Sequence, residues 1–522
     1  MRTLFPFTAV VLVLAVLFGG ATRQGYLGDS VVQLAACVLL APSLWMFIES
    51  KGWRRLDGIS IAFLTAMIVL CLVQLVPFFP RLRVEYLIAP AIAGDGPTVG
   101  GFWGRVSLTP AASWAAIISG IVPLALFLAV MQCDVRARLQ LWRLILALGI
   151  LALLIGLVQI FQGPASRLRF FEITNTADAV GFFANRNHFA AQLYVTLAFA
   201  GAWVASAAQR VKWQKGMWKK GMSASPAVVS LATAVGLVLL IIAALAVARS
   251  RAGILIAIGI VVGIGLIVLR SPAADRSATS RRLASRTIII ILSVSVLFVV
   301  QLALQSVIDR FQQDIADDLR LPLAKATLQA AVSALPFGTG IGSFPQVYAT
   351  IENPANLLPA YVNHAHNDFA EFFLEAGLPA LALITLFLVW FAWRTLAVWS
   401  IDGIGDDETY VNVARAASLA IAGLLIHAFV DYGLRTTALA ALFAVACGLL
   451  TSPPPTRKRA EKSPRASAPP KRPSPPERPF AAHPASGPAP QPPAWPQDMQ
   501  WPKAWTSTDK PSPKPDLNDR SK

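Results

Sequence analysis

The chain has 522 residues, of which 55% are hydrophobic and only 14% are charged, and its formal net charge at pH 7 is +17. Soluble globular proteins have about a quarter of their residues charged, so this composition excludes that class and indicates a polytopic membrane protein. The basic residues lie in short clusters between apolar runs and in the C-terminal tail, without interleaved aromatic residues, and so do not indicate a nucleic-acid-binding protein.

Apolar runs predict the fold class. Windows of about 20 apolar residues, the length that crosses the hydrocarbon core of a bilayer, indicate about twelve transmembrane helices in an all-α polytopic chain. We expect these spans near residues 4–21, 30–49, 59–79, 114–132, 141–162, 188–207, 228–248, 252–269, 287–305, 373–393, 413–431 and 438–451. Further spans follow the first run at once, so we interpret that run as a retained helix and not a cleaved signal peptide.

The positions of basic residues predict the orientation. Clusters that include Lys51, Arg138 and Arg210 follow the second, fourth and sixth spans, and residues 270–286 form a basic run after the eighth. Loops rich in lysine and arginine stay in the cytoplasm, so we expect both termini there and the odd-numbered loops on the outer, periplasmic side. The largest outer loop, residues 306–372, lies between the ninth and tenth spans.

Composition divides the chain into a membrane domain, residues 1–451, and a tail, residues 452–522. The tail is rich in proline, serine, lysine and arginine and cannot bury enough apolar surface to fold, so we predict that it is disordered. It could contact anionic lipid or a partner protein, but a solvated linker is the simpler interpretation. The four cysteines show no C-x-x-C spacing, so neither a disulfide framework nor a zinc site is indicated.

The large outer loop contains an amphipathic run and a glycine-rich segment. Apolar residues recur at helical spacing between residues 308 and 328, which predicts a helix on the membrane surface or across the mouth of the bundle. Gly338, Gly340 and Gly342 then alternate with other residues. Glycine permits positive φ and lets backbone amides approach an anion, although a tight turn after the helix explains the same spacing.

Two histidines, an amide and a carboxylate end this loop: His364, His366, Asn367 and Asp368. Neutral imidazole is a suitable general base for a sugar hydroxyl, because its pKa lies near ambient pH. This density of polar groups at the start of a span favours a functional site over a structural histidine. Helical spacing turns Asp368 and Glu371 away from His366, so these neighbours do not indicate a metal site.

Basic residues also lie in two other outer turns. Arg186 and His188 open the sixth span, and Arg249 and Arg251 lie between the seventh and eighth. Arginines between apolar runs must face water, headgroups, a cavity or an anion, because their transfer into lipid is unfavourable. Their outer position opposes the usual cytoplasmic bias, so we favour a phosphate-bearing ligand, which matches the planar fork of arginine.

His427 and Asp431 lie four residues apart at the end of the eleventh span. On one helix they would share a face. They would then either pair with each other as a structural lock or line the cavity, and the sequence does not separate these alternatives.

Several short motifs occur in a fixed order along residues 142–451. They are N-R-N-H-F at 185–189, S-R-A-G at 250–253, P-F-G-T-G-I-G-S-F at 336–344, H-A-H-N-D-F-A-E-F-F-L-E-A-G-L at 364–378 and H-A-F-V-D-Y at 427–432. In this order they resemble the O-antigen ligase and polymerase family of bacterial membrane proteins. Gly377 corresponds to a downstream glycine of that family, and the tail after Thr451 takes no part in the resemblance.

The resemblance implies a C-type membrane glycosyltransferase architecture in the bacterial inner membrane. It implies an undecaprenyl-pyrophosphate-linked glycan as donor and neither a metal nor another cofactor. It also implies that His366 with Asn367 performs acid/base chemistry, and that Arg249 or Arg251, together with Arg186, binds the pyrophosphate.

We therefore expect a glycan transferase that acts on an acceptor hydroxyl at the outer face of the membrane. The acceptor is lipid A core for a ligase, a growing polysaccharide for a polymerase, or a protein for an O-oligosaccharyltransferase. The motifs neither separate these nor decide between His364 and His366 as the base. A transporter or flippase is disfavoured because the ionisable residues lie at span ends, away from mid-span. A scaffold that acts through the tail is the remaining alternative.

Overall fold

A computed structural model describes residues 4–23, 25–76, 79–80, 103–104, 106–214, 226–270, 320–352, 362–401, 408–452 and 494. Contacts divide the chain into two units, residues 1–460 and 461–522, and the elements named below belong to the first. The ninth predicted span, the first part of the large outer loop and almost all of the tail lie outside the described residues.

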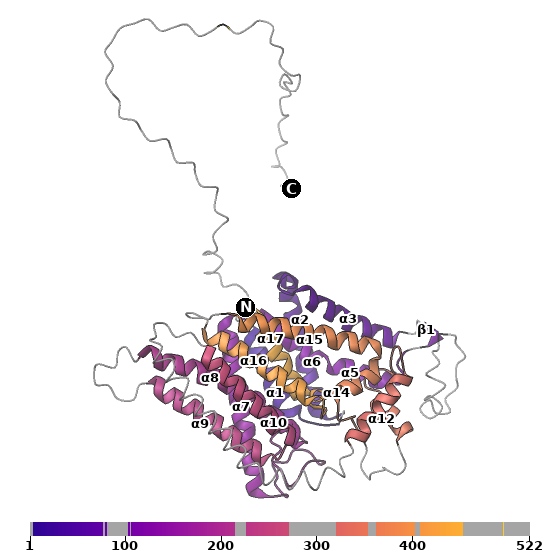
Figure 1. The fold of residues 1–522 in the computed structure, drawn as a ribbon. Coiled ribbons are helices and arrows are strands. Elements are labelled where there is room, and N and C mark those ends of the chain that lie inside the picture. The colour runs from indigo at the N-terminus through magenta and orange to yellow at the C-terminus, as the bar shows by residue number, and fades with distance from the viewer. Residues whose placement is uncertain are drawn as a thin grey trace, which may run out of the picture. The chain divides into compact units, whose positions relative to one another are not determined.

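Long helices that lie side by side make up most of the first unit (Figure 1). In chain order the helices are α1 (Leu4–Phe18), α2 (Leu27–Glu49), α3 (Gly58–Leu75), α5 (Pro110–Ser119), α6 (Ile121–Gln132), α7 (Val135–Gln162), α8 (Arg186–Gln214), α9 (Pro226–Val247), α10 (Arg251–Arg270), α12 (Arg320–Ser333), α13 (Phe344–Ile351), α14 (Asp368–Ala376), α15 (Leu378–Trp399), α16 (Glu408–His427) and α17 (Thr437–Leu450). The other described elements are two 3-10 turns, η1 (Gly52–Arg55) and η3 (Gly433–Arg435), and two short antiparallel strands, β1 (Phe79–Pro80) and β2 (Trp103–Gly104).

The described helices confirm the prediction of an all-helical polytopic membrane protein. Within the described residues, nine helical segments are long and apolar enough to cross a membrane, and α1 and α17 are shorter apolar helices. These segments fall on the predicted spans other than the ninth. Large apolar side chains such as Trp45, Leu255 and Leu396 are exposed on their surfaces, as a lipid-facing surface requires.

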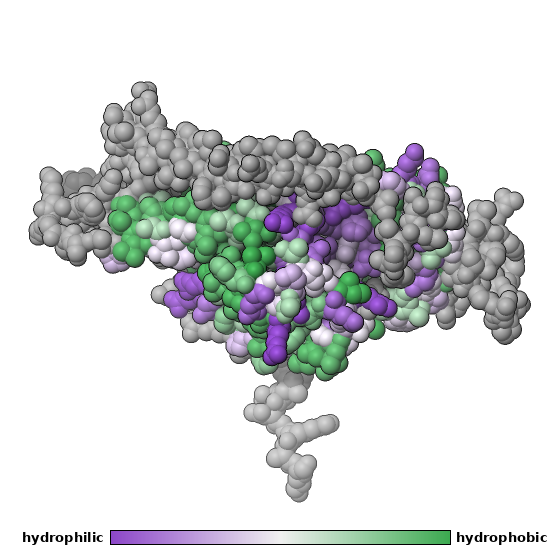
Figure 2. Space-filling model, turned by 90° about the horizontal axis from the view of Figure 1, so that it is seen from below, coloured by the Kyte–Doolittle hydropathy of each residue, from purple (hydrophilic) through white to green (hydrophobic). Residues whose placement is uncertain are grey.

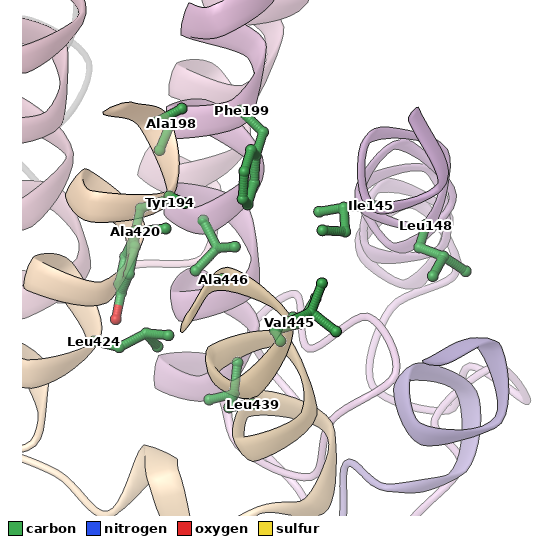
Figure 3. Close-up of a cluster of buried hydrophobic side chains, with 14 of the residues drawn as sticks. Ile145, Leu148, Tyr194, Ala198, Phe199, Ala420, Leu424, Leu439, Val445 and Ala446 are labelled. Carbon is green, nitrogen blue, oxygen red and sulfur yellow. The ribbon is translucent and has the colours of Figure 1, made fainter. Parts of the chain in front are cut away.

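Helix α8 lies at the centre of the helical packing. It contacts α7, α9, α10 and α16, and most of its side chains are buried, whereas most of those of α2, α3 and α15 are not. Small residues let the backbones approach closely. A Cβ on Gly149 of α7 would lie 2.1 Å from the hydroxyl oxygen of Thr196. Figure 3 shows side chains of α7, α8, α16 and α17 gathered in this core, including Tyr194, Leu424 and Val445.

Two predicted spans are interrupted. Residues 114–132 form two helices that meet at Gly120, because Pro123 has no amide hydrogen to donate to Ser119. The tenth predicted span, residues 373–393, is divided into α14 and α15 by Gly377, whose φ is 61°. A Cβ on Gly377 would lie 2.2 Å from the carbonyl oxygen of Pro336, so only glycine fits this junction.

The eleventh span ends earlier than predicted. Helix α16 ends at His427, and Asp431 lies in the turn that follows. The two side chains bind different partners: Nδ1 of His427 lies 3.2 Å from the hydroxyl of Tyr194, and Asp431 binds His366 and Asn187. The structure therefore does not place His427 and Asp431 in a mutual lock.

One arginine of the predicted cytoplasmic loops is buried. Arg138 donates hydrogen bonds to the hydroxyl of Tyr410 and to the carbonyl oxygens of Gly448 and Thr451, at 2.6, 3.0 and 2.7 Å. It therefore joins α7 to the ends of α16 and α17. Arg138 is buried at this junction, whereas the neighbouring Arg136 is exposed.

Backbone hydrogen bonds join several loops at one end of the bundle. The amide of Ala184, before α8, donates to the carbonyl of Gly20, after α1, at 3.0 Å. The amide of Asp368, at the start of α14, donates to the carbonyl of Ala428, after α16, at 2.8 Å. These loops carry most of the polar residues singled out from the sequence. Figure 2 shows hydrophilic residues gathered near the middle of one face, with hydrophobic residues beside them.

Candidate active site

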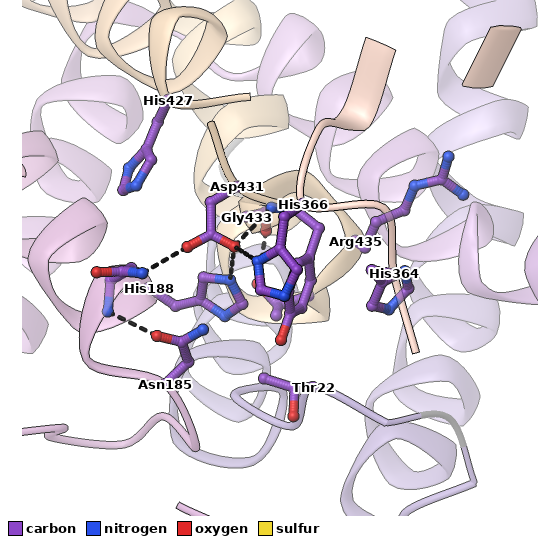
Figure 4. A network of polar contacts seen from close by, with 12 residues as sticks. Thr22, Asn185, His188, His364, His366, His427, Asp431, Gly433 and Arg435 are labelled. Carbon is purple, nitrogen blue, oxygen red and sulfur yellow. Dashed lines mark hydrogen bonds and ion pairs between the residues drawn. The ribbon is translucent and has the colours of Figure 1, made fainter. Parts of the chain in front are cut away.

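An aspartate and a histidine from distant segments meet at this end of the bundle. Oδ1 of Asp431 lies 3.1 Å from Nδ1 of His366, and Oδ2 accepts a hydrogen bond from Nδ2 of Asn187 at 2.7 Å. Asp431 is fully buried, whereas 27% of the His366 side chain is exposed. Figure 4 shows the carboxylate facing the imidazole ring. The pair is therefore anchored at its carboxylate and accessible at its imidazole.

The hydrogen bonds of this pair determine the ionisation of Asp431 and the tautomer of His366. Burial acts to raise the pKa of Asp431, but the hydrogen bond from His366 and the nearby His188 and Arg320 hold that pKa well below its ordinary value. An ionised carboxylate only accepts hydrogen bonds, so the hydrogen of the neutral imidazole lies on Nδ1. The lone pair is then on Nε2, where a general base requires it.

The backbone at His366 adopts an unfavourable conformation. Its φ is 50°, in the left-handed region, which costs a non-glycine residue about 1–2 kcal/mol. Asn367 follows and caps α14, because its Oδ1 accepts hydrogen bonds from the amides of Phe369 and Ala370 at 3.1 and 2.9 Å. The cap fixes the residue at which α14 begins. In the structure Asn367 thus holds the segment that carries His366.

Tyr432 packs among three histidines. Its ring centroid lies 4.4 Å from that of His364, 4.8 Å from that of His366 and 4.9 Å from that of His188. His188 is fully buried, and its Nε2 lies 3.9 Å from Oδ1 of Asp431. Sequence reasoning missed Tyr432, although its position directly after Asp431 in the H-A-F-V-D-Y motif is a signal for it.

A second pair of a histidine and a carboxylate lies beside the first. Nδ1 of His364 lies 2.9 Å from Oε1 of Glu371. Nη1 of Arg435 lies 2.9 Å from Glu375 and 3.5 Å from Glu371, and its Nε lies 3.4 Å from Asp368. The three carboxylates share one face of α14, because they are three or four residues apart. Glu371 and Glu375 were not predicted as site residues, and their E-x-x-x-E spacing is the signal that identifies them.

One guanidinium group is shared by three buried carboxylates. Burial raises the pKa of Asp368 to about 7, against the attraction of Arg435. Burial likewise raises the pKa of Glu375. It acts in the same direction on Glu371, but Arg435 and His364 outweigh it and lower that pKa. The cluster therefore keeps Glu371 ionised and lets Asp368 hold a proton near neutral pH.

Two of the predicted phosphate-binding arginines meet at Asp178. Nη1 of Arg186 pairs with Oδ2 of Asp178, and Nη1 of Arg249 lies 3.8 Å from Oδ1. The Arg249 side chain is 54% exposed and its backbone φ is 50°. Arg251 begins α10 two residues further on. Asp178, which the sequence did not single out, thus brings together the arginine that begins α8 and one in the turn before α10.

The start of α8 connects these arginines to the aspartate–histidine pair. Arg186 and Asn187 are adjacent, and they bind Asp178 and Asp431 respectively. The first turn of α8 therefore connects Arg186, which pairs with Asp178, to the carboxylate that binds His366.

The glycine-rich turn uses its amides within the protein. The amides of Gly338, Gly340 and Gly342 donate to the carbonyl of Ala334, the carbonyl of Glu375 and Oε1 of Glu375, at 2.9, 2.9 and 2.8 Å. All three glycines have positive φ, and each lies closer to a neighbouring atom than a Cβ would permit. These contacts favour the tight-turn interpretation over an anion cradle.

The described residues combine an imidazole base, carboxylates and arginines. Such groups suit proton abstraction and the stabilisation of negative charge on a leaving group. Within the part of the chain that the structure describes, no three His, Cys, Asp or Glu side chains are arranged to hold a metal ion.

Comparison with known proteins agrees with the resemblance seen in the motifs. Residues 235–385 match the family model described as O-antigen ligase. The matched residues include Arg249, Arg251, the glycine-rich turn, His364, His366 and the acidic face of α14. No curated protein matches the chain.

Proposed function

The chain carries a domain of the O-antigen ligase family, and from that membership we propose that it transfers an oligo- or polysaccharide from an undecaprenyl-pyrophosphate donor to an acceptor hydroxyl. The reaction takes place at the outer face of a bacterial inner membrane, with both termini in the cytoplasm. The observation that supports this most strongly is the pair formed by Asp431 and His366, whose accessible imidazole suits the deprotonation of a hydroxyl.

His366 acts as the general base. The acceptor hydroxyl gives its proton to Nε2, and its oxygen attacks the anomeric carbon of the donor sugar. A carbon–oxygen bond forms while the bond from that carbon to the pyrophosphate breaks, and the pyrophosphate leaves with the electron pair. Asp431 stabilises the imidazolium that results. Proton transfer of this kind contributes about 10²–10⁴-fold to a rate.

Arg186 and Arg249 stabilise the departing pyrophosphate. The guanidinium groups of Arg186 and Arg249 both lie at the carboxylate of Asp178, so two positive charges meet there. Positive groups that are already in place where negative charge develops lower the barrier without reorganisation. Arg251, which begins α10 two residues after Arg249, belongs to this proposed subsite.

His366 is a better candidate for the base than His364. Both have a carboxylate at Nδ1, but 27% of the His366 side chain is exposed, compared with 11% for His364. Glu371, the partner of His364, is also shared with Arg435. The imidazole of His366 is therefore the more accessible of the two.

A deletion strain tests the proposed function. Loss of ligated chains with accumulation of lipid-linked glycan indicates a ligase, core with a single repeat indicates a polymerase, and intact lipopolysaccharide with unglycosylated proteins indicates a protein O-oligosaccharyltransferase. The wild-type gene and the control His483→Ala, in the tail, should restore the glycans, and His366→Ala should not. Unchanged surface glycans without accumulated donor in the deletion strain would contradict the proposal.

A further inference from the structure

A cavity of about 340 Å³ lies beside the second histidine pair. Its lining includes Arg23, Gln346, Asn363, His364, Glu371 and Arg435. Its volume is at the lower end of the range of small-molecule sites, about 300–1,000 Å³. The proposed proton transfer and pyrophosphate binding leave this cavity without a role.

Two side chains at the cavity are held in place by other groups. Arg435 is fixed by its ion pairs with the carboxylates of α14. His364 is fixed by Glu371 at Nδ1 and by stacking of its ring on Tyr432 at 4.4 Å. Side chains locked in this way are pre-organised, so a ligand that binds them loses little free energy in ordering them.

The lining matches the chemistry of a saccharide. Sugar hydroxyls both donate and accept hydrogen bonds, and the cavity offers carboxylates, guanidinium groups, amides and an imidazole. Two arginines, Arg23 and Arg435, and two glutamates, Glu371 and Glu375, line the same cavity. A balanced lining favours a neutral polyhydroxyl ligand over a phosphate, in contrast to the arginines at Asp178.

The cavity also lies close to the proposed base. The ring of Tyr432 stacks on His364 at 4.4 Å and meets the edge of His366 at 4.8 Å, so one aromatic ring connects the cavity with the base. Figure 4 shows His188 on one side of His366 and Arg435 on the other. The pyrophosphate-binding arginines are on the His188 side, because Arg186 lies at the start of the same helix.

We propose that this cavity binds a neutral saccharide unit of the acceptor and so places the acceptor hydroxyl at His366. In a displacement at an anomeric carbon, the nucleophile attacks one face of the sugar and the leaving group departs from the opposite face. The arginines bind the leaving group on one side of the sugar, so the acceptor approaches from the other side, where the cavity lies. This inference rests on the proposed transferase function.

Filling the cavity tests the inference in a transfer assay with the full chain in lipid nanodiscs and with donor extracted from the deletion strain. Gln346 and Ala349 are both exposed on α13, but only Gln346 lines the cavity. Gln346→Trp should raise the KM for the acceptor about tenfold, equivalent to about 1.4 kcal/mol, without changing the KM for the donor. The matched control Ala349→Trp should change neither. A rise in the donor KM alone would assign the cavity to the donor and overturn the inference, and so would an unchanged acceptor KM.

Binding measured without turnover separates this inference from the proposed function. Saturation-transfer NMR with methyl glucoside, methyl galactoside and methyl N-acetylglucosaminide should detect binding of at least one of them to the His366→Ala protein. The signal should persist with Ala349→Trp and disappear with Gln346→Trp. If no glycoside binds, the saccharide assignment is wrong even where transfer activity is present. If a glycoside binds in this manner to a protein that transfers no glycan, the cavity assignment stands and the transferase proposal fails.

Discussion

Nδ1 of His366 lies 3.1 Å from the carboxylate of Asp431, although 65 residues separate the two in the chain. Asp431 lies in the turn between α16 and α17, and His366 lies just before α14. A buried carboxylate at Nδ1 sets both the orientation and the tautomer of an imidazole base. In the proposed mechanism, proton transfer at His366 therefore depends on the contact between the large loop and the end of the helical bundle.

Replacement of Asp431 tests its positioning role. We expect Asp431→Asn to lower kcat by about 10²–10⁴-fold with little change in either KM, because an amide that donates to Nδ1 favours the wrong tautomer. Steady-state kinetics on purified protein measure this split. The control is Asp29→Asn, whose carboxylate accepts a hydrogen bond from Thr437 at the same end of the bundle. A wild-type kcat for folded Asp431→Asn would rule out the positioning role.

Removal of the two arginine charges beside Asp178 tests the proposed leaving-group site. The double variant Arg186→Gln, Arg249→Gln should raise the KM for the donor by about tenfold to a hundredfold, because two charge-assisted hydrogen bonds are lost. The acceptor KM should not change. Arg210→Gln, in the last part of α8, is the control for charge removal on the same helix. A donor KM equal to that of the control would exclude these arginines from pyrophosphate binding.

The raised pKa of Asp368 predicts that the stability of the protein depends on pH. Its pKa rises from the ordinary value of 3.8 to about 7 in the folded protein, so folding retains a proton that the unfolded chain releases. The stability contributed by this group is therefore full below about pH 4 and is lost as the pH rises towards about 7.

The variant Asp368→Asn cannot ionise at this position, so its stability does not fall with pH for this reason. Relative to wild type, Asp368→Asn should gain stability between about pH 4 and pH 7, with a limiting slope of about 1.4 kcal/mol per pH unit. Unfolding midpoints in detergent at several pH values in this range measure the difference, with Glu352→Gln as the control for loss of a carboxylate elsewhere. A difference that stays constant with pH would contradict the shifted pKa.

Apolar length was sufficient to predict most spans, because each needs about 20 apolar residues whatever its neighbours are. Helix α8, for example, begins at Arg186, two residues before its predicted start. The junction at Gly377 was not predictable in this way. Its positive φ follows from the close approach of Pro336, which is a tertiary contact and leaves no local periodic signal.

The candidate site was partly visible in the sequence for a related reason. Ionisable residues are rare within apolar membrane spans, so Arg249, between two such runs, and His366, just before one, stand out by composition alone. Asp178 lies in a loop of ordinary polarity, and its importance comes from the arginines that the fold brings to it. Likewise, 60 residues separate Glu375 from Arg435, and only the packing of α14 against η3 reveals their pairing.

The rate of glycan transfer by purified His366→Ala protein is the most direct measurement of the proposed mechanism. With donor and acceptor both saturating, kcat should fall at least about 100-fold relative to wild type, because the general base is lost. The control His483→Ala, in the tail, should retain the wild-type kcat. A kcat for His366→Ala close to that of wild type would show that His366 is not the base.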